Sequence, residues 1–541
     1  MGWYCCQLNQ RLYSHHHPFY DSLSYNANML RTITEARESG FAAAMELACF
    51  QNATNCLPFI VGAVIAPVVD PSRMIGVWIQ TAFLFLFLAS LLYYLVRVHR
   101  LAATTALAGC LAFLAAKCLI FPNGGLSDFR MDLSLYLTFG MTCVWYLISM
   151  SRPTKINFIL LGASASMACL FRATAPIYLL FCLGPVCLID LFPQEQRREK
   201  LIGIVTATLT VVLLSGWFFY FNFEYLKYYY FEWNTDANAK LPFSEAARHW
   251  KLAQRSIGEP LAYMILIWLI LVTLVTRRKS TIGTWLKSAW LDRSIDWRIA
   301  WLGLGPVVML IARRAGLNPF VCMPAVFGLV LFFLLPCLKQ IERLADKTLT
   351  RTCWTLLIIA LALSATRGWM KHGPDEFNTR QAHNELIDVV IADAKQNEIG
   401  TINFAVIQLT DLDSNGLYSS LLFDRPDISP GLNSVHYGDK EIFRIPTFAR
   451  PAATDWKNIK GETDEEKRQF LIDDANVRIN YLIVPDERSA EWLQQSASHN
   501  FINRHLVPLR AKIVSDPSWV LIAAPIKTNE KETVEVYRKQ R

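Results

Sequence analysis

Long apolar runs separated by short polar segments fill the first two thirds of the chain. A helix needs about 20 apolar residues to cross the hydrocarbon core of a bilayer, and many of these runs approach or reach that length. The runs that predict single membrane-spanning helices cover residues 74–96, 101–121, 133–150, 201–223 and 260–276. The pattern therefore predicts a polytopic α-helical membrane domain over residues 57–370.

The remaining apolar stretches are interrupted or short. Residues 158–191 predict a helix pair broken at Arg172, and residues 300–337 predict a second pair broken at the segment ARRAGLN. A last run covers residues 353–365. Residues 57–69 contain two prolines and are too few to span comfortably, so we expect an interfacial or re-entrant helix there.

Lysine and arginine gather between alternate runs. These basic clusters lie at residues 97–100, 151–155, 196–200, 277–280 and 339–351. Basic loops of membrane proteins face the cytoplasm. We therefore expect a multi-pass membrane protein with a defined orientation. Its extracytoplasmic face would carry the N-terminal stretch, residues 122–132, residues 224–259 and everything after Arg367.

Composition agrees with this prediction and narrows the function classes. Of the 541 residues, 53% are hydrophobic and 18% are charged, whereas soluble domains carry about 25% charged residues. Much of the net charge of +8 lies in the basic clusters, so it does not indicate a nucleic-acid partner. All 13 cysteines precede Trp354, and no CxxC pair indicates a metal or redox centre.

The last part of the chain has the composition of a soluble domain. A helical pattern at residues 380–395 precedes a short strand at 402–407, and a second helix is expected at 487–496. Further strands are predicted in INYLIVPDE, WVLIAAPI and TVEVYRK. This alternation predicts a small extracytoplasmic α/β domain over residues 371–541. It carries no phosphate-binding glycine motif and no nucleophile elbow, so we expect it to support or gate a site.

The first 56 residues predict an extracytoplasmic loop with amphipathic helices. In the stretch PFYDSLSYNANMLRTITEARESG, a helix would place Asp21, Tyr25 and Asn28 on one face and apolar side chains on another. Such a helix is suited to the bilayer surface. Asp21 is then either a helix cap or a carboxylate presented to water and substrate.

A second acidic cluster lies in the segment GGLSDFRMDLSLY. Asp132 stands at the mouth of the next spanning helix, and Asp128 and Arg130 precede it. An acid at a membrane entry is costly unless it is solvated, paired or functional. One interpretation is an ion pair with Arg130 that holds the loop. The other is that two outer-loop acids form a base and its partner, or bind a divalent cation through oxygen ligands.

Arginines interrupt two apolar runs near the same predicted face. Arg172 lies within CLFRATAPIYLL, and Arg313 and Arg314 lie within MLIARRAGLNPF. Guanidinium groups suit phosphate oxygens, so these arginines are candidate ligands of an anionic headgroup. Alternatively, each arginine is the charge partner of an acid. For Arg313 and Arg314, a further alternative is that their side chains snorkel towards the membrane interface.

The order of these features resembles that of the membrane-embedded GT-C glycosyltransferases, especially the bacterial protein O-mannosyltransferase and lipid A aminoarabinose transferase group. The segment YDSLSYNANMLRTITEARESG is similar to the acidic first outer helix of that family, with Asp21 at the acid. The segment RMDLSLYLTF is similar to its second acidic motif, which favours Asp132 over Asp128. LLGASASMACLFRATAP resembles a glycine-rich helix followed by a basic residue, here Arg172.

Two features depart from the family pattern. A transmembrane helix precedes the first acidic loop in that family, whereas only MGWYCCQLNQRLYSHHH precedes it here. A later outer motif is loosely matched by RRAGLNPFVCMPAVFG, where Asn318 occupies the expected arginine spacing and Arg314 is a substitute.

The resemblance implies transfer of a sugar from a polyprenyl-phosphate carrier to a lipid, glycan or protein acceptor at the outer face of the plasma (bacterial inner) membrane. Such a reaction needs a carboxylate at the acceptor hydroxyl and cations at the phosphate leaving group. Asp21 would be the base, and Asp132 or Asp128 a second acid or the ligand of a divalent metal. Tyr25, Arg172, Arg313 and Arg314 would bind the substrates. The rival predictions are a lipid-linked saccharide transporter or flippase, for which inverted repeats are expected, and a non-enzymatic envelope assembly protein.

Overall fold

The computed structural model divides into two compact units. One unit comprises Met1–Asn9 and Glu35–His372, and the other comprises Gln10–Thr34 and Gly373–Arg541. The residues that the structure describes are 2–13, 21–51, 55–69, 72, 74–193, 196–227, 242–279, 296–314, 317–318, 320–372, 379–399, 402–406, 443–444, 461–496, 506–528 and 532–540.

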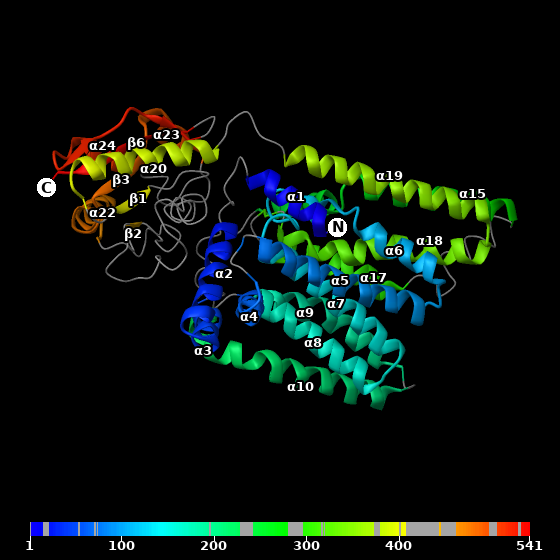
Figure 1. Cartoon of the computed structure of the whole chain (residues 1–541). Helices are drawn as coiled ribbons and strands as arrows, with labels where there is room; N and C mark the ends of the chain where they lie inside the picture. Colours follow the sequence, from blue (N-terminus) through cyan, green and yellow to red (C-terminus); the bar gives the residue numbers. More distant parts are fainter. Residues whose placement is uncertain are drawn as a thin grey trace. The chain divides into compact units, whose positions relative to one another are not determined.

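The first unit is a bundle of long apolar helices (Figure 1). Its principal helices are α4 (Leu57–Ile65), α5 (Met74–Arg97), α6 (Ala103–Phe113), α7 (Met131–Ser151), α8 (Lys155–Phe171), α9 (Ala175–Leu191), α10 (Arg197–Phe221), α15 (Glu259–Lys279), α17 (Trp297–Arg313), α18 (Pro324–Leu344) and α19 (Lys347–Lys371). Within the described part of the chain, six are long and apolar enough to cross a membrane, namely α5, α7, α10, α15, α18 and α19. The predicted polytopic membrane domain is confirmed.

Helix α7 lies in the interior of this bundle. Of its apolar window 94% is buried, against 22% for α10. Helix α7 packs against α5, α8, α9 and α18, whereas α10 leaves side chains such as Leu209 and Leu213 exposed. Exposed leucines are expected on a helix that faces lipid. Asp132, in the first turn of α7, therefore lies inside the protein.

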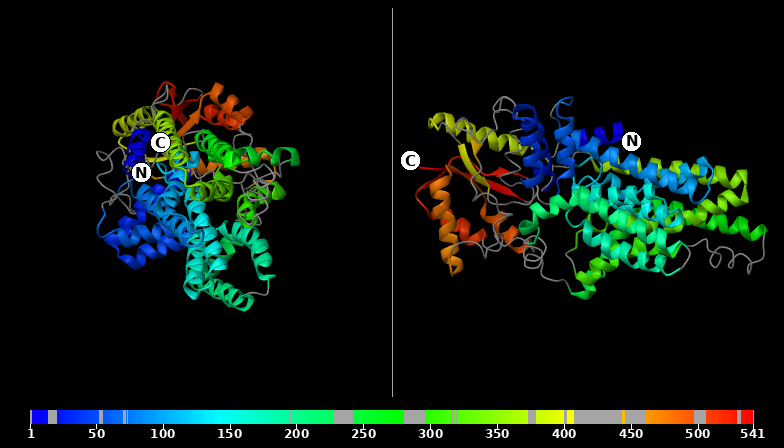
Figure 2. Two further views of the ribbon diagram at one scale, coloured as in Figure 1. Left: turned by 90° about the vertical axis from the view of Figure 1, so that its right-hand side faces the viewer. Right: turned by 90° about the horizontal axis from the view of Figure 1, so that it is seen from below.

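Successive helices of the bundle, with the shorter α6, α8, α9 and α17 included, run in opposite directions, so their connections alternate between two ends of the bundle (Figures 1 and 2). At one end, the Arg152 side chain, directly after α7, donates a hydrogen bond to the carbonyl of Arg97, the last residue of α5. We call this the basic end, because most of the basic clusters lie there. At the other end, Gln80 near the start of α5 donates to the carbonyl of Arg130, directly before α7, at 2.8 Å. We call this the site end.

The prediction of a single spanning helix over residues 101–121 is wrong. Residues 101–121 form α6 and then a separate 3-10 turn, η2 (Lys117–Ile120). Helix α6 ends early, and the hydroxyl of Ser364 on α19 donates to the carbonyl of Ala115 at 3.0 Å, which satisfies a backbone group that the helix leaves free. An 11-residue helix is about 17 Å long, well short of the roughly 30 Å hydrocarbon core.

The interruptions predicted in the apolar stretches are observed. Arg172 separates α8 from α9, and the segment ARRAGLN separates α17 from α18. Gly303 on α17 and Gly328 on α18 allow the two helices to pack backbone to backbone. A Cβ atom on Gly303 would lie 2.4 Å from the backbone nitrogen of Leu329. Small residues permit such close approach between membrane helices. The contact fixes the connection between α17 and α18, which lies at the site end.

The second unit contains a mixed sheet covered by helices (Figure 1). Its elements are α20 (Thr379–Gln396), β1 (Ile402–Val406), β2 (Phe443–Arg444), α22 (Asp464–Arg478), β3 (Tyr481–Pro485), α23 (Glu487–Ser496), α24 (Leu506–Ser515), β4 (Trp519–Leu521), β5 (Ile526–Lys527) and β6 (Thr533–Lys539). The described strands follow the order β2-β1-β3-β6-β4, with β5 on β6. Strand β1 is parallel to β2 and β3, and β6 is antiparallel to its neighbours. The predicted small α/β domain is confirmed, although WVLIAAPI forms two strands instead of one.

The polar stretch near the N-terminus forms helix α2 (Asp21–Glu38). Its buried face consists of Ser22, Asn26, Met29 and Ile33, which recur at the spacing of one helix face. Residues up to Thr34 belong to the second unit, in which Arg380 also donates a hydrogen bond to the carbonyl of Tyr13 at 3.0 Å.

Candidate functional site

Three charged side chains meet at the start of α7. Asp132 lies in the first turn, and its Oδ2 atom accepts a hydrogen bond from Nε of Arg130 at 3.0 Å. Its Oδ1 atom lies 3.3 Å from Nη2 of Arg172. The side chains of Arg130 and Asp132 are only 7% and 4% exposed, and that of Arg172 is 17% exposed. We call Arg130, Asp132 and Arg172 the arginine–aspartate triad.

The ends of two helices bring the triad together. Arg130 is the extended residue that precedes α7, and Arg172 is the extended residue that follows α8. Because both break the helical path, their side chains converge on an acid that lies on the adjacent helix turn. An acidic residue in the first turn also interacts favourably with the helix dipole. One carboxylate thus holds two guanidinium groups, and the triad has a formal charge of +1.

The guanidinium group of Arg130 is held from several sides. It lies over the ring of Phe320 at 4.0 Å from the centroid, and its Nη1 atom donates to Oδ1 of Asn123 at 3.1 Å. Its backbone carbonyl accepts from Gln80 on α5. A cation over an aromatic face is stabilised by about 0.5–2 kcal/mol, depending on its exposure. Arg130 is therefore set in place before any ligand arrives.

The connection between α17 and α18 supplies Phe320. The Oδ1 atom of Asn318 accepts the backbone N–H of Phe320 at 2.9 Å, and the hydroxyl of Tyr178 on α9 donates to the carbonyl of Val321 at 2.9 Å. Gly124 allows the approach from the facing loop, because its φ is +87° and a Cβ atom there would lie 2.6 Å from the Phe320 ring. The loosely matched segment RRAGLNPF thus reaches the triad through its phenylalanine.

Asp128 holds the loop that precedes α7. Its side chain is fully buried, and its Oδ2 atom accepts the backbone N–H of Gly124 at 2.6 Å. The next residue back, Ser127, shares a 2.6 Å hydrogen bond with Nε2 of His372 at the end of α19. Its carbonyl accepts from Asn9 of α1 (Gly2–Tyr13) at 2.7 Å. These contacts give Asp128 a role in fixing the loop.

The other predicted site residues lie elsewhere along the chain. Asp21 begins α2, and its side chain lies outside the described residues; Tyr25 is half-buried one turn later. Both belong to the second unit, so their approach to the triad stays a prediction. Arg313 is exposed at the end of α17, and Arg314 follows it with a φ of +54° that ends the helix. The substrate contacts predicted for these arginines also remain predictions.

In the described part of the chain, the predicted acids are not accompanied by enough ligands to bind a metal. No group of three His, Cys, Asp or Glu side chains converges there. Both oxygens of Asp132 are already engaged by arginines. Guanidinium groups suit phosphate oxygens, so two arginines on one carboxylate make the triad a candidate site for an anion.

Sequence reasoning considered Arg130 only as a partner that holds the loop and missed Phe320. The signal for Arg130 was present, because it lies between two acids in SDFRMD directly before an apolar run. Nothing local marks Phe320, because its contact depends on how α9, α17 and α18 pack.

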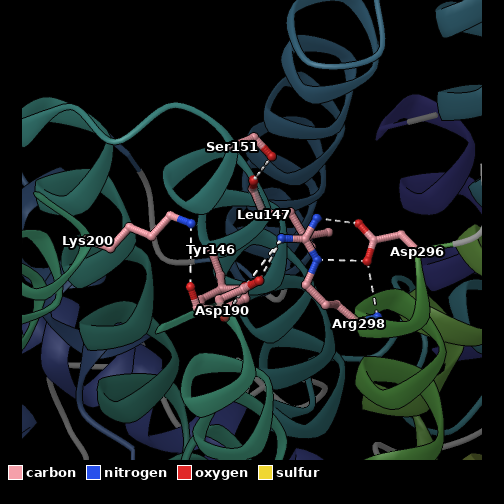
Figure 3. A network of polar contacts seen from close by, with 7 residues as sticks. All are labelled: Tyr146, Leu147, Ser151, Asp190, Lys200, Asp296 and Arg298. Atoms are coloured by element: carbon pink, nitrogen blue, oxygen red, sulfur yellow. Dashed lines mark hydrogen bonds and ion pairs between the residues drawn. The ribbon is translucent and has the colours of Figure 1, made fainter. Parts of the chain in front are cut away.

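A second group of charged side chains lies at the basic end of α7 (Figure 3). Arg298, near the start of α17, donates from Nη2 to Oδ2 of Asp296 at 2.6 Å and from Nη1 to Oδ1 of Asp190 on α9 at 3.2 Å. The hydroxyl of Tyr146 on α7 donates to Oδ2 of Asp190 at 2.7 Å. Lys200 reaches the carbonyl of Asp190 at 3.4 Å. We call Asp190, Asp296 and Arg298 the basic-end cluster.

The fold and the triad define a class of protein: a multi-pass membrane helix bundle with a small α/β domain and a cationic site at one end of the bundle. No protein-family model and no curated protein matches the sequence. Among solved structures, ArnT from Cupriavidus metallidurans bound to undecaprenyl phosphate matches with a TM-score of 0.56 and 10% identity, over 98% of this chain and 95% of that chain. The apo state of that ArnT matches with a TM-score of 0.52 and 10% identity, over 96% and 94%. The chain therefore has an ArnT-like fold, which confirms the GT-C-like architecture that the resemblance predicts.

Proposed function

We propose that this protein transfers a sugar from a polyprenyl-phosphate carrier to a lipid, glycan or protein acceptor at the extracytoplasmic face of the bacterial inner membrane. The observation that carries the proposal is the arginine–aspartate triad at the site end of an ArnT-like bundle. The ArnT structure with bound undecaprenyl phosphate supports the choice of donor.

The triad supports binding of the donor phosphate. Arg172 is its most exposed member, so its guanidinium group is the one we assign to the phosphate oxygens. Arg130 is nearly buried and stacked on Phe320, and it adds positive charge close to the leaving group. Fixed cations that face a developing phosphate charge favour bond breaking.

Asp132 acts in this proposal as a positioning residue. Both of its oxygens hold guanidinium groups, so it is poorly placed to take a proton from an acceptor. We assign that step to Asp21 of α2, which would deprotonate or orient the acceptor hydroxyl. Tyr25, Arg313 and Arg314 remain proposed contacts of the sugar or headgroup.

Sugar transfer by the purified full-length protein tests the proposed chemistry. The assay follows release of polyprenyl phosphate from a polyprenyl-phosphate sugar in detergent, with Asp21→Asn beside the parent. Asn keeps the shape and capping ability of Asp but removes its charge. If Asp21 is the base, transfer should fall by about a hundredfold or more, with expression and lipid binding retained. Near-normal turnover would refute the assigned role.

Labelling of single added cysteines tests the proposed orientation. Gln254 is exposed on α14 (His249–Ile257) at the site end, and Glu199 is exposed at the start of α10 at the basic end. A membrane-impermeant maleimide added to intact cells should label Gln254→Cys above the parent level. Glu199→Cys should react only after the membrane is permeabilised. Reversed labelling of both positions would overturn the orientation.

A further inference from the structure

Basic side chains gather on the surface of the site end, around the first residue of α15. Lys117 begins η2, Arg255 lies in the last turn of α14, and Arg367 and Lys371 lie one turn apart at the end of α19. Glu259, which begins α15, lies among them. We call these five residues the basic patch. Its four cations and one carboxylate give it a formal charge of +3.

Helix packing holds the members of the patch together. Nη1 of Arg367 donates to Oε2 of Glu259 at 2.5 Å. The preceding residue, Gly258, has a φ of +83°, and a Cβ atom there would lie 2.5 Å from Cβ of Lys117. A Cβ atom on Gly368 of α19 would lie 3.3 Å from the last side chain of η2. The ends of η2, α14 and α19 therefore meet at the start of α15.

The charged groups of the patch are accessible to a ligand. Arg255 and Lys371 are exposed, and the paired side chains of Arg367 and Glu259 are 47% and 59% exposed. Lys117 is half-buried. Burial lowers the pKa of Lys117, and the positive charges of the other three cations lower it further. An anion that binds between these cations would relieve their mutual repulsion.

Exposed aromatic rings place the patch at the level of the lipid headgroups. Trp250 on α14, Tyr263 on α15 and Trp369 on α19 are all exposed, and Trp and Tyr are enriched where membrane helices meet water. Helices α15 and α19 are both candidate spans. Basic residues are expected at the cytoplasmic ends of spans, whereas we propose that the site end faces the other side. The topology of the chain therefore does not account for this patch.

We infer that the basic patch binds the phosphate group of an anionic phospholipid of the surrounding bilayer, of the phosphatidylglycerol type. Arginine and lysine donate charge-assisted hydrogen bonds to phosphate oxygens, and clustered basic residues beside membrane helices recognise anionic headgroups. The flanking rings favour a lipid over a dissolved anion. The inference goes beyond the proposed function, because this lipid is neither the sugar donor nor the acceptor.

Helix α14 separates the patch from the triad. Its buried residue His249 accepts, at its carbonyl, a 3.6 Å hydrogen bond from Sγ of Cys322. Cys322 ends the turn η5 (Phe320–Cys322), whose first residue stacks on Arg130 of the triad. Arg255 lies on the exposed side of the same helix. The two cationic sites therefore lie against different faces of α14, and a lipid on the patch would hold the helix that supports η5.

Native mass spectrometry of the full-length protein tests the inference. The protein is purified, stripped of lipid in detergent and titrated with phosphatidylglycerol, with zwitterionic phosphatidylcholine as the reference. The parent protein should retain phosphatidylglycerol in preference. The double variant Arg255→Gln with Lys371→Gln removes two exposed charges and should bind it about thirtyfold more weakly, from roughly fivefold for each basic residue at an anionic headgroup.

The acid of the patch gives a test with the opposite sign. Glu259→Gln removes its carboxylate and frees Arg367, so phosphatidylglycerol should bind about fivefold more tightly. A merely structural role of these residues would not produce a gain. Because Arg255, Lys371 and Glu259 are all exposed, thermal unfolding of both variants should match that of the parent.

A control variant at the basic end distinguishes the patch from general charge attraction. Arg197→Gln with Arg198→Gln also removes two exposed charges, but neighbouring helix positions do not face each other, so affinity should stay near that of the parent. Equal losses in the two double variants would overturn the inference. So would equal retention of both lipids by the parent, or displacement of phosphatidylglycerol by an equal concentration of inorganic phosphate.

The inference and the proposed function can fail separately. Arg172→Ala, which alters the triad, should retain its affinity for phosphatidylglycerol, and loss of that affinity would place the lipid at the triad instead. Sugar transfer is measured on the same preparations. Preference for the anionic lipid without transfer rejects only the enzyme, whereas transfer without that preference rejects only the lipid site.

Discussion

The two ends of α7 carry the same kinds of charged side chain in opposite proportions. At the site end, Asp132 holds two arginines. At the basic end, the single guanidinium group of Arg298 is held by two carboxylates (Figure 3). Asp132 and Tyr146 are 14 positions apart on one helix, so the two groups are separated by about 21 Å.

The ratio of arginines to carboxylates indicates different functions for the two ends of α7. In the basic-end cluster, carboxylates engage the Nε, Nη1 and Nη2 atoms of Arg298, and its formal charge is −1. Little is left there to attract an anion. In the triad, one carboxylate contacts two guanidinium groups, an arrangement that suits the anionic ligand we propose. The comparison therefore supports the proposal that the site end binds the ligand and that the basic end attaches helices to one another.

The strongest test of this comparison removes one carboxylate charge at each end. Asp132→Asn should lower sugar transfer by about a hundredfold, because a neutral amide no longer positions both arginines and small misplacements of binding groups cost that much. Asp190→Asn at the basic end should leave transfer within about threefold of the parent, a change of less than 1 kcal/mol in barrier. The measurement is turnover of both purified variants with one donor. Equal losses would mean that both ends serve only stability.

A smaller effect is expected when the exposed arginine of the triad is changed. Arg172→Ala should weaken binding of polyprenyl phosphate by about tenfold, the worth of one charge-assisted hydrogen bond. Arg172→Lys should recover only part of the affinity, because a point charge does not reproduce the guanidinium fork. Affinity is measured by quenching of tryptophan fluorescence on titration with the lipid.

Arg298→Lys is the matched control at the other end and should leave lipid affinity unchanged. If Arg172→Ala binds the lipid as the parent does, Arg172 is only the ion-pair partner of Asp132.

The sequence predicts the bundle and two members of the triad for physical reasons. Apolar runs of bilayer length leave few alternatives to spanning helices. An arginine inside such a run, like Arg172, and an acid at its mouth, like Asp132, stand out because each is costly in lipid. The helix break at Arg172 also follows from the sequence, because Pro176 lies four residues later and favours the start of a new helix.

The sequence does not predict contacts that join distant segments. Arg298 and Asp190 are 108 positions apart, and nothing local to either indicates its partner. The role of Asp132 as a second acid or metal ligand could not be weighed against positioning, because that choice depends on which atoms contact its two oxygens. The early end of α6 was missed for the same reason, since the partner of the Ala115 carbonyl is Ser364 on α19.

The third test examines stability at the basic end. Arg298→Met leaves Asp190 and Asp296 facing each other without a cation. Removing one partner from a buried ion pair can cost 3–5 kcal/mol, but these side chains are 14–26% exposed, so we expect about 1–2 kcal/mol. Thermal unfolding in detergent should show a transition lowered by a few degrees. Transfer at 25 °C should be retained.

The double variant Arg298→Met with Asp296→Asn removes the repulsion and should recover part of the stability. If Arg298→Met melts like the parent, the basic-end cluster does not hold α9 to α17.

The smallest expected effect is a pH dependence confined to the basic end. His99 follows α5, and its ring packs edge-on against Tyr94 at 4.7 Å between centroids. Burial, and then the charge of Lys339, lower the pKa of His99 to about 3. The unfolded chain binds a proton near pH 6.5 and the folded chain does not, so stability is full above that pH and falls as pH drops towards 3.

Hydrogen exchange localises this pH effect. Between pH 7.5 and 6, exchange in residues 97–102 should accelerate by about fourfold beyond its intrinsic pH dependence, which corresponds to about 0.8 kcal/mol. Residues 172–178 at the site end carry no histidine and serve as the internal reference. His99→Gln cannot gain a proton and should abolish the difference between the two segments. Acceleration of equal size in both segments, or its persistence in His99→Gln, would show that the bundle loosens as a whole and that the basic end has no titrating contact of its own.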